Sequence, residues 1–419
     1  MANFLIKIFR KVLFIASFSL VIPFVIIFLT PFKNKIKFVK IRRDVIGNSI
    51  EQLYLYLNIY KKNKYHYFFF DDYFICNEYF NEICKKNLKF SLFGKTIFYL
   101  SQHIKIFNKF ILNMPTWRTL YKTQTNIKNF KVPKEFKFSN IQNDVGKNFL
   151  TSLGVKKNQK IICLMIRDGS YKKKHSNNSK RNWNYHNYRN ADLDTYLKTI
   201  KYLNKKGYFV IRMGKGAEKF LTYKHPMYFD YARSKVRSDF LDFWVYSNAF
   251  FSIVTGTGSD ELSAVYDIPT INTNYNLHGY LRAGRHNNIS IIKKIKYIKT
   301  DKFLTLSEIV SLFFFSDIGL LSENKNLKVI DNSADEIFNA TKEMIDLINK
   351  KYKLTKDYII NEKNFWKKIF EIDKKNKNKV NIFDQHYNFD ALMYIYKYKI
   401  ILNDKISIKF HLNNLWLKK

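Results

Sequence analysis

Three groups of polar and charged residues follow strongly apolar runs, and they contain the side chains best suited to chemistry. The groups are Arg167 with Asp168, Arg212 with Gly214, and the turn formed by Gly256, Thr257, Gly258 and Ser259. Arginine suits phosphate because its planar guanidinium donates two hydrogen bonds, and a glycine turn before a helix offers unpaired backbone N–H groups. The groups therefore predict a site for an anion such as phosphate. The glycine turn alone also fits an ordinary connection between a strand and a helix.

The apolar runs have the length and composition of buried strands, at residues 161–166, 208–213, 250–254 and 269–271. A helical pattern covers 191–206, with Asn190 as N-cap, Gly207 after its end, and an apolar face of Leu193, Tyr196, Leu197, Ile200 and Leu203. A short helix containing Glu261 and Ala264 follows the glycine turn. Strands alternating with helices predict a mostly parallel sheet, whose carboxyl edge would bring the three groups together in a polar crevice.

Length and composition limit the possible classes of protein. A chain of 419 residues favours two domains with appendages, and its three cysteines have neither zinc-ligand nor disulfide spacing. The net charge of +39 accompanies abundant Asn, Ile, Phe and Tyr, which indicates compositional drift rather than a selected basic patch. We therefore expect no nucleic-acid partner. Anionic lipid is the better partner for this charge.

Residues 12–32 form an uncharged apolar run of about the length that spans a bilayer. A cleaved secretory signal is the alternative, but no small-residue cleavage pattern follows the run. More basic residues follow the run than precede it, which favours a cytoplasmic body. Pro23 leaves open a hairpin that enters the membrane without crossing it. Both interpretations give a membrane anchor at residues 1–35.

The rest of the chain divides into three expected parts. Residues 36–150 would form a first Rossmann-like domain, with strands at 37–41 and 67–70 and a helix at 49–60 that Asn48 and Glu51 would cap. Residues 151–330 would form a second such domain. Residues 131–160 would connect the two domains, and residues 274–289 would be an exposed loop of the second. Residues 331–419 would be a helical extension that packs back on the body, and helices are expected at 305–315 and at 335–350, the latter with a Ser333–Glu336 capping box.

The second half of the chain contains the motifs Arg167-Asp168-x-x-Tyr171, His186-x-Tyr188-Arg189-Asn190, Gly207-Tyr208-x-Val210-x-Arg212-Met213-Gly214, Arg237-Ser238-Asp239-Phe240-x-Asp242 and the glycine turn. An earlier motif is Arg43-x-x-Ile46-Gly47-x-x-x-Glu51. With these motifs the sequence resembles a family of bacterial glycosyltransferases associated with surface-polysaccharide loci. The resemblance implies the α/β architecture of two Rossmann-like domains called GT-B.

The resemblance also implies a reaction, in which a sugar moves from a nucleotide-sugar donor to a lipid-linked or surface glycan at the bacterial inner membrane. Fixed cations and N–H groups must then offset charge on the leaving diphosphate. Arg167 is similar to the strand-end arginine by which fucosyltransferase-like GT-B enzymes hold the donor phosphate. The other residues implied in donor binding are Arg189, Arg212, Gly214, the turn Gly256, Thr257, Gly258 and Ser259, and Glu261, which would take the ribose hydroxyls.

An inverting transfer needs a base for the acceptor hydroxyl, and Asp168 or His186 could serve. Structural alternatives exist for each: Asp168 could form an ion pair and His186 could be solvated. Arg189 could pair with Asp192 or Asp194, and Arg237 with Asp239 could orient the helix that follows them. The only Asp-x-Asp spacing near a predicted strand, Asp192 and Asp194, falls at a helix start, so we expect transfer without a metal or a resident cofactor.

Two other functions remain open from the sequence. A nucleotide-sugar epimerase or a glycerophosphate-type transferase would use the same fold and similar glycine turns. A non-catalytic scaffold on a degenerate transferase fold is the third hypothesis.

Overall fold

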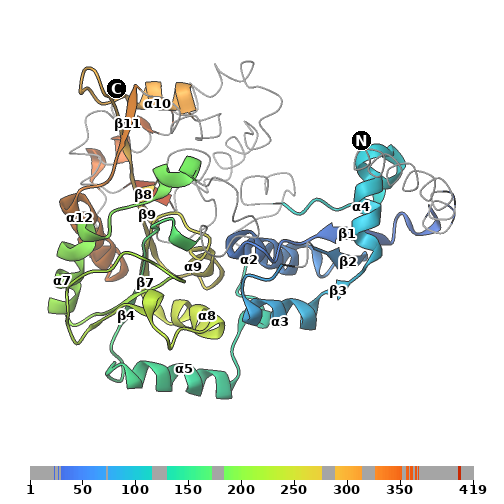
Figure 1. Ribbon diagram of the computed structural model, residues 1–419, viewed down its shortest axis with the longest axis horizontal. Helices are drawn as coiled ribbons and strands as arrows, with labels where there is room; N and C mark the ends of the chain where they lie inside the picture. The colour runs from blue at the N-terminus through green and yellow to red at the C-terminus, as the bar shows by residue number, and fades with distance from the viewer. Residues whose placement is uncertain are drawn as a thin grey trace, which may run out of the picture.

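The computed structural model describes residues 30–71, 74–115, 130–171, 184–275, 288–313 and 326–351, with a few residues outside these ranges, among them 404–406. Two parallel sheets lie in two units of the chain, which we call the N-terminal unit (residues 30–115) and the C-terminal unit (residues 130–351 and 404–406) (Figure 1). A two-stranded antiparallel ribbon of β10 (Lys294–Tyr297) and β11 (Leu327–Ile330) adjoins the second sheet. The predicted α/β class with parallel sheets is confirmed.

The N-terminal unit is built on three short strands in the order β1-β2-β3, all parallel. The strands are β1 (Ile36–Lys40), β2 (His66–Phe70) and β3 (Lys89–Phe90). Its helices are α2 (Ile46–Leu55), which continues as a π-helical turn (Tyr56–Tyr60), α3 (Glu78–Asn87), α4 (Phe93–His103) and the 3-10 helix η3 (Lys105–Phe110). Helix α2 and the turn after it bury Ile50, Leu53, Tyr54 and Leu57.

The predicted cap at Asn48 is wrong. Helix α2 begins at Ile46, after Val45, which contributes no side-chain cap, and Asn48 is exposed in the first turn. The earlier start places Gly47 inside the helix, where its lack of a side chain permits a close contact with the C-terminal unit. The helix start is therefore set by packing between units rather than by a local cap.

A buried ion pair holds the turn after β1. Arg43 donates to the carboxylate of Asp71 at the end of β2 and to Asn81 of α3, and its guanidinium lies 4.5 Å from the ring centroid of Phe90. Arg43 and Asp71 are both buried. The motif that begins at Arg43 thus contains a residue that links the end of β2, helix α3 and strand β3.

The C-terminal unit contains a seven-stranded parallel sheet in the order β12-β9-β8-β7-β4-β5-β6. Its strands are β4 (Ile161–Met165), β5 (Phe209–Arg212), β6 (Tyr228–Phe229), β7 (Ala249–Val254), β8 (Thr270–Tyr275), β9 (Asn288–Ile292) and β12 (Asp404–Ile406). From β4 the chain moves outward to β6, and from β7 it moves outward in the opposite direction. The order therefore reverses between β4 and β7.

This reversal places helices on both faces of the sheet, since parallel crossovers keep one hand. Helix α7 (Leu197–Lys205) and α12 (Ala334–Ile348) pack together on one face. Helices α8 (Asp239–Ser247) and α9 (Glu261–Val265) pack together and follow the opposite turn of the chain. Figure 1 shows α7 and α12 on the side away from the N-terminal unit, and α8 and α9 toward it.

Several helix ends agree with the sequence and one does not. Gly207 adopts a φ of 84° after α7, and Ser333 and Glu336 form the predicted capping box of α12. The helix predicted at 305–315 is present as α10 (Leu306–Phe313). Asn190 is not an N-cap, because its amide oxygen accepts from Arg167 Nε at 3.2 Å. Asp192 caps instead, ahead of the 3-10 turn η8 (Leu193–Tyr196) that precedes α7.

The connection predicted at 131–160 contains a helix that the sequence did not reveal, α5 (Asn140–Ser152). A capping box of Ser139 and Gln142 begins it, and Trp244 Nε1 of α8 donates to its Asn143 Oδ1 at 3.0 Å. A Cβ at Gly146 would lie 2.1 Å from the Trp244 ring, so only glycine fits there. The apolar pattern is misleading because Ile141 and Val145 are exposed.

Some expected segments lie outside the described residues. They include all but a few residues of the apolar run 12–32, residues 276–287 of the expected loop, and most of 352–419. Among the helices that the structure describes, none is both long and apolar enough to span a membrane. In the tail, residues 404–406 return to the body as expected, but they form an edge strand beside β9 rather than a helix.

Replacing Asp71 by alanine would leave the Arg43 guanidinium buried without its carboxylate. We expect the free energy of unfolding, measured by urea denaturation of the full chain, to fall by about 3–5 kcal/mol. Asp44→Ala is the matched control, because it removes a partly exposed pair with Arg42 and should cost about 0–1 kcal/mol. Equal stability of the two variants would contradict the role assigned to the buried pair.

Candidate functional site

The carboxyl ends of β4 and β7 are joined at the point where the strand order reverses. The backbone N–H of Arg167 donates to Thr255 Oγ1 at 3.0 Å, and the Thr255 hydroxyl lies 3.4 Å from the Met165 carbonyl oxygen. Open parallel sheets bind ligands at such a reversal, because the flanking loops leave in opposite directions and form a crevice. Two of the three predicted groups, those of Arg167 and of the glycine turn, meet here.

Arg189 joins these groups from the 3-10 helix η7 (Asn184–Arg189). Its guanidinium donates to the carbonyl oxygen of Gly256, so the ion pair expected with Asp192 or Asp194 is replaced by a contact with the glycine turn. The Ala191 N–H donates to the Arg167 carbonyl oxygen at 3.0 Å, which ties the segment after η7 to the end of β4. Arg189 thus places a cation beside the turn, and the Arg167 side chain, at the end of β4, donates to Asn190.

The glycine turn is pressed against the N-terminal unit. A Cβ added at Gly47 would lie 2.6 Å from the Gly258 Cα, and one added at Gly258 would lie 2.9 Å from the Gly47 nitrogen. Gly256 has a φ of 68°, in the left-handed region that favours glycine, and Thr257 Oγ1 lies 3.2 Å from Ser259 Oγ. The turn after β7 is therefore in direct contact with the first turn of α2.

Glu261 begins α9, the short helix that follows this turn. Its backbone N–H lies 3.3 Å from the Gly258 carbonyl oxygen, and its side chain is buried. The residue is therefore next to the turn, as predicted, but on its buried side.

Arg212 does not face the crevice in this structure. Its side chain is 1% exposed, and Nη1 donates to Asp230 Oδ2 at 2.9 Å and to the Lys219 carbonyl oxygen at 2.5 Å. The residue holds the segment between β5 and β6 against the sheet, which differs from the predicted phosphate contact. Gly214 does lie at the turn after β5, with a φ of 142°.

Asp168 has a structural role that makes it a poor base. Its carboxylate accepts from the Ser170 N–H at 3.1 Å and hydroxyl, and from the Glu218 N–H at 2.9 Å. Burial alone would raise the pKa of Asp168, but these hydrogen bonds outweigh burial and hold the pKa below its ordinary value. The structure supports the alternative of a structural carboxylate, with backbone and hydroxyl donors in place of the expected ion pair. The backbone of His186 lies in η7, and its side chain is outside the described residues.

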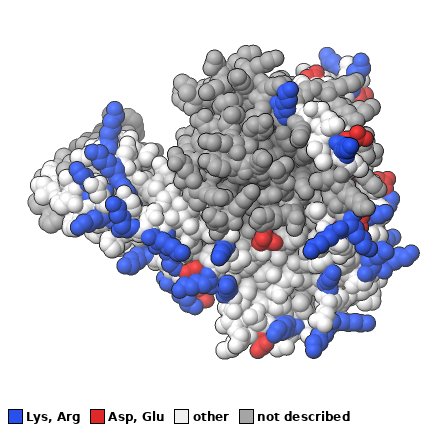
Figure 2. Space-filling model, turned by 180° about the vertical axis from the view of Figure 1, so that it is seen from behind, with Lys and Arg blue, Asp and Glu red and all other residues white. Residues whose placement is uncertain are grey.

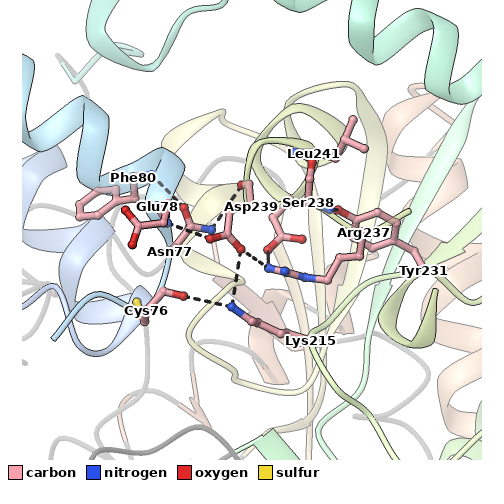
Figure 3. A network of polar contacts seen from close by, with 11 residues as sticks. Cys76, Asn77, Glu78, Phe80, Lys215, Tyr231, Arg237, Ser238, Asp239 and Leu241 are labelled. Atoms are coloured by element: carbon pink, nitrogen blue, oxygen red, sulfur yellow. Dashed lines mark hydrogen bonds and ion pairs between the residues drawn. The ribbon is translucent and has the colours of Figure 1, made fainter. Parts of the chain in front are cut away.

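A polar network joins the two units beside this crevice (Figure 3). Asp239 of α8 accepts from the Glu78 N–H at 2.8 Å, and the Asn77 side chain lies 3.3 Å from the Asp239 carbonyl oxygen. Lys215 reaches both units, with Nζ 3.6 Å from Asp239 Oδ1 and 3.4 Å from the Cys76 carbonyl oxygen. The network therefore connects the N-terminus of α3 to that of α8.

Arg237 completes the network, as one of the sequence alternatives predicted. It donates to Asp239 at 2.7 Å and to Asp242, and so orients the start of α8. Burial raises the pKa of Asp242 to about 6 although Arg237 opposes the shift. Burial likewise raises the pKa of Tyr171 to about 12, with Arg237, Asp239 and Asp242 close enough to influence it. The motif that ends at Tyr171 and the motif that begins at Arg237 therefore meet at the junction of the units.

Lys293 is a further cation at this edge of the sheet that the sequence did not reveal. It follows β9, is buried, and donates to the Asn190 carbonyl oxygen at 2.5 Å and to Asp331 at 2.7 Å. Burial lowers the pKa of Lys293, and Asp331 opposes the shift. Its role is to hold the segment after η7 in place.

A cavity of about 430 Å³ lies on the N-terminal side of the junction. Its lining combines cations, amides and apolar side chains, namely Lys40, Arg42, Gln52, Phe98, Leu112, Asn113 and Met114. Lys40 ends β1 and Arg42 begins the turn to α2, so the cavity lies at the carboxyl edge of the first sheet. No group of three His, Cys, Asp or Glu residues that could hold a metal occurs among the described residues.

The lowered pKa of Asp168 gives a test of its structural role. The folded pKa lies below the ordinary value of 3.8, so the stabilisation is present above that value and is lost as the pH falls through the folded pKa. We expect Asp168→Asn to melt below wild type at pH 7, with a difference that shrinks below about pH 4. Asp144→Asn, at an exposed position of α5, should show little difference at either pH. A difference for Asp168→Asn that stays constant down to acid pH would refute this role.

Comparisons of the sequence with protein-family models and with curated proteins find no match. Among solved structures, the chain is similar to the glycosyl transferase family 9 protein from Veillonella parvula DSM 2008, with 10% identity, coverage of 74% of this chain and 97% of that chain, and a TM-score of 0.44. It is also similar to E. coli ADP-heptose lps heptosyltransferase II, with 8% identity, coverage of 69% and 100%, and a TM-score of 0.36. The S. aureus MnaA–UDP structure gives 10% identity, coverage of 74% and 88%, and a TM-score of 0.32.

Proposed function

We propose that the chain is a glycosyltransferase of the GT-B type that moves a sugar from a nucleotide-sugar donor to an envelope or surface-polysaccharide acceptor. The observation that supports it most is the reversal between β4 and β7, where Arg167, Arg189 and the glycine turn come together. The motif resemblance agrees with it, because Arg167, Arg189 and the glycine turn belong to the quoted motifs.

The donor diphosphate would lie at this crevice. Cleavage of the bond between the sugar and the diphosphate leaves negative charge on phosphate oxygens, and preorganised cations stabilise that charge in the transition state. Arg167 and Arg189 would supply the cations, and the backbone of Thr257 to Ser259 would supply N–H groups. Gly214 would border the same crevice, and Glu261 would take the ribose hydroxyls after a local rearrangement. Arg212 would then act only indirectly, by holding the segment after β5.

The acceptor would enter from the N-terminal unit. The cavity lined by Lys40, Arg42 and Gln52 offers cationic and amide groups to a glycan or its phosphate. His186 is the remaining predicted base, since the donors around Asp168 stabilise its carboxylate. Transfer would need no metal and no resident cofactor, because the arginines supply the positive charge. We place the reaction on the cytoplasmic side of the bacterial inner membrane.

Nucleotide binding by the full chain tests the donor site. We expect one nucleotide from a panel of UDP, GDP, CMP, CDP, ADP and TDP to raise the melting temperature, with or without magnesium. Arg167→Ala should weaken that binding about 10–100-fold, since loss of a charged hydrogen-bond partner costs about 1.5–3 kcal/mol. Arg233→Ala, at an exposed arginine of the same unit, is the control and should bind as wild type does.

Two outcomes would count against the proposal. Unchanged nucleotide binding by a folded Arg167→Ala protein would show that the diphosphate does not bind beside Arg167. No shift with any nucleotide would favour the scaffold hypothesis. Analysis of products from a bound nucleotide-sugar then separates the enzymes: transfer to a glycan supports the proposal, whereas free sugar isomers or a phosphodiester polymer support the alternatives.

A further inference from the structure

Apolar side chains are exposed at the outer end of the N-terminal unit. Leu92 is 80% exposed and Phe93 is 74% exposed, and both lie at the turn between β3 and the first residue of α4. In Figure 1, α4 stands at the edge of the molecule farthest from the seven-stranded sheet. Neighbouring large side chains in such a position indicate a surface that binds something.

The packing of α4 explains why these residues are not part of the core. One face of the helix buries Ile97 and Leu100 with Phe38 and Phe70 of the sheet. The opposite face presents Leu92, Lys95, Tyr99 and His103, which follow one another at spacings of three or four residues and are exposed. The face of α4 toward the sheet is thus apolar, and the opposite face mixes apolar and polar side chains. The turn before the helix exposes two large apolar side chains.

The charge around this turn has one sign. Residues 88–115 contain Lys89, Lys95, Lys105 and Lys109 and no aspartate or glutamate, and all four lysines are exposed. Lys37 Nζ donates to the Lys109 carbonyl oxygen at 2.5 Å, which connects β1 to η3, and the preceding Lys33 and Lys35 are exposed. Figure 2 shows Lys and Arg side chains gathered over this unit.

We propose that this α4 surface, formed by Leu92, Phe93, Lys95, Tyr99 and Lys105, docks on an anionic phospholipid bilayer. Exposed Leu and Phe insert at the boundary between headgroups and acyl chains, while surrounding lysines contact the phosphates. An acyl boundary suits these residues better than a protein, because the apolar part is a protruding turn rather than a groove and the charge is uniformly positive. The surface is separate from the donor crevice, so the proposal does not depend on transferase activity.

The cysteine content makes a direct test possible. Cys76, Cys84 and Cys163 are free and buried, so a soluble thiol-reactive fluorophore will attach to an introduced surface cysteine. Leu92→Cys and Ile141→Cys are the matched pair, because Ile141 is 78% exposed on α5, outside the N-terminal unit. Both variants retain the full chain with residues 12–32, so any membrane attachment through that run is common to them.

Each labelled protein is mixed with vesicles of phosphatidylcholine and phosphatidylglycerol that contain a nitroxide quencher on the acyl chain. We expect the label of Leu92→Cys to lose about half its fluorescence or more, and the label of Ile141→Cys to lose little, because only a docked turn reaches acyl depth. Vesicles of phosphatidylcholine alone should quench the Leu92→Cys label less. Adding Lys95→Glu and Lys105→Glu to Leu92→Cys should reduce quenching on the anionic vesicles.

Equal quenching of the two labels, or no quenching of either, would overturn the proposal. Equal quenching of the Leu92→Cys label by neutral and anionic vesicles would remove the role of the lysines. If the Leu92→Cys label is unquenched by lipid but shielded from aqueous iodide without vesicles, the surface binds protein and the proposal fails.

Discussion

Two glycine backbones touch where the units of this protein meet, and the candidate site depends on that contact. Gly47 lies in the first turn of α2 and Gly258 in the turn after β7, and a side chain on either would collide with the other's backbone. Because the approach is this close, the amide groups at the start of α2 come beside the turn at the reversal of strand order. Residues of the two units therefore lie next to each other at the candidate site.

The sequence was sufficient for the parts of the fold that depend on local pattern. Strands buried on both faces are continuous apolar runs, so β4, β5 and β7 were recognisable, and the capping box at Ser333 located α12. Helix α5 was missed because Ile141 and Val145 face solvent while Gly146 packs on Trp244, which inverts the usual pattern. The caps proposed at Asn48 and Asn190 failed because tertiary contacts determine where those helices begin.

For the candidate residues, the edge of the sheet was predictable but the depth of each side chain was not. The end of a parallel strand indicates which edge of the sheet a residue occupies, and this placed Arg167 and the glycine turn correctly at one edge. It does not indicate depth, so Arg212 was expected in the crevice although its guanidinium is buried against Asp230. The network around Asp239 joins residues from two units, and no spacing within the sequence encodes that contact. Arg43 and Lys293 show the same limit, because both are buried cations that hold neighbouring segments in place.

The edge strand β12 has a consequence for how the protein is synthesised. Residues 404–406 pair with β9, although a long stretch of chain separates the two strands in sequence. During translation β9 leaves the ribosome well before β12. Until β12 is synthesised, the backbone N–H and C=O groups on the outer edge of β9 lack the hydrogen bonds that β12 later supplies. Unpaired strand edges are templates for association with other chains. The nascent protein is therefore most prone to aggregation late in synthesis, and completion of the sheet is coupled to the last part of the chain described here.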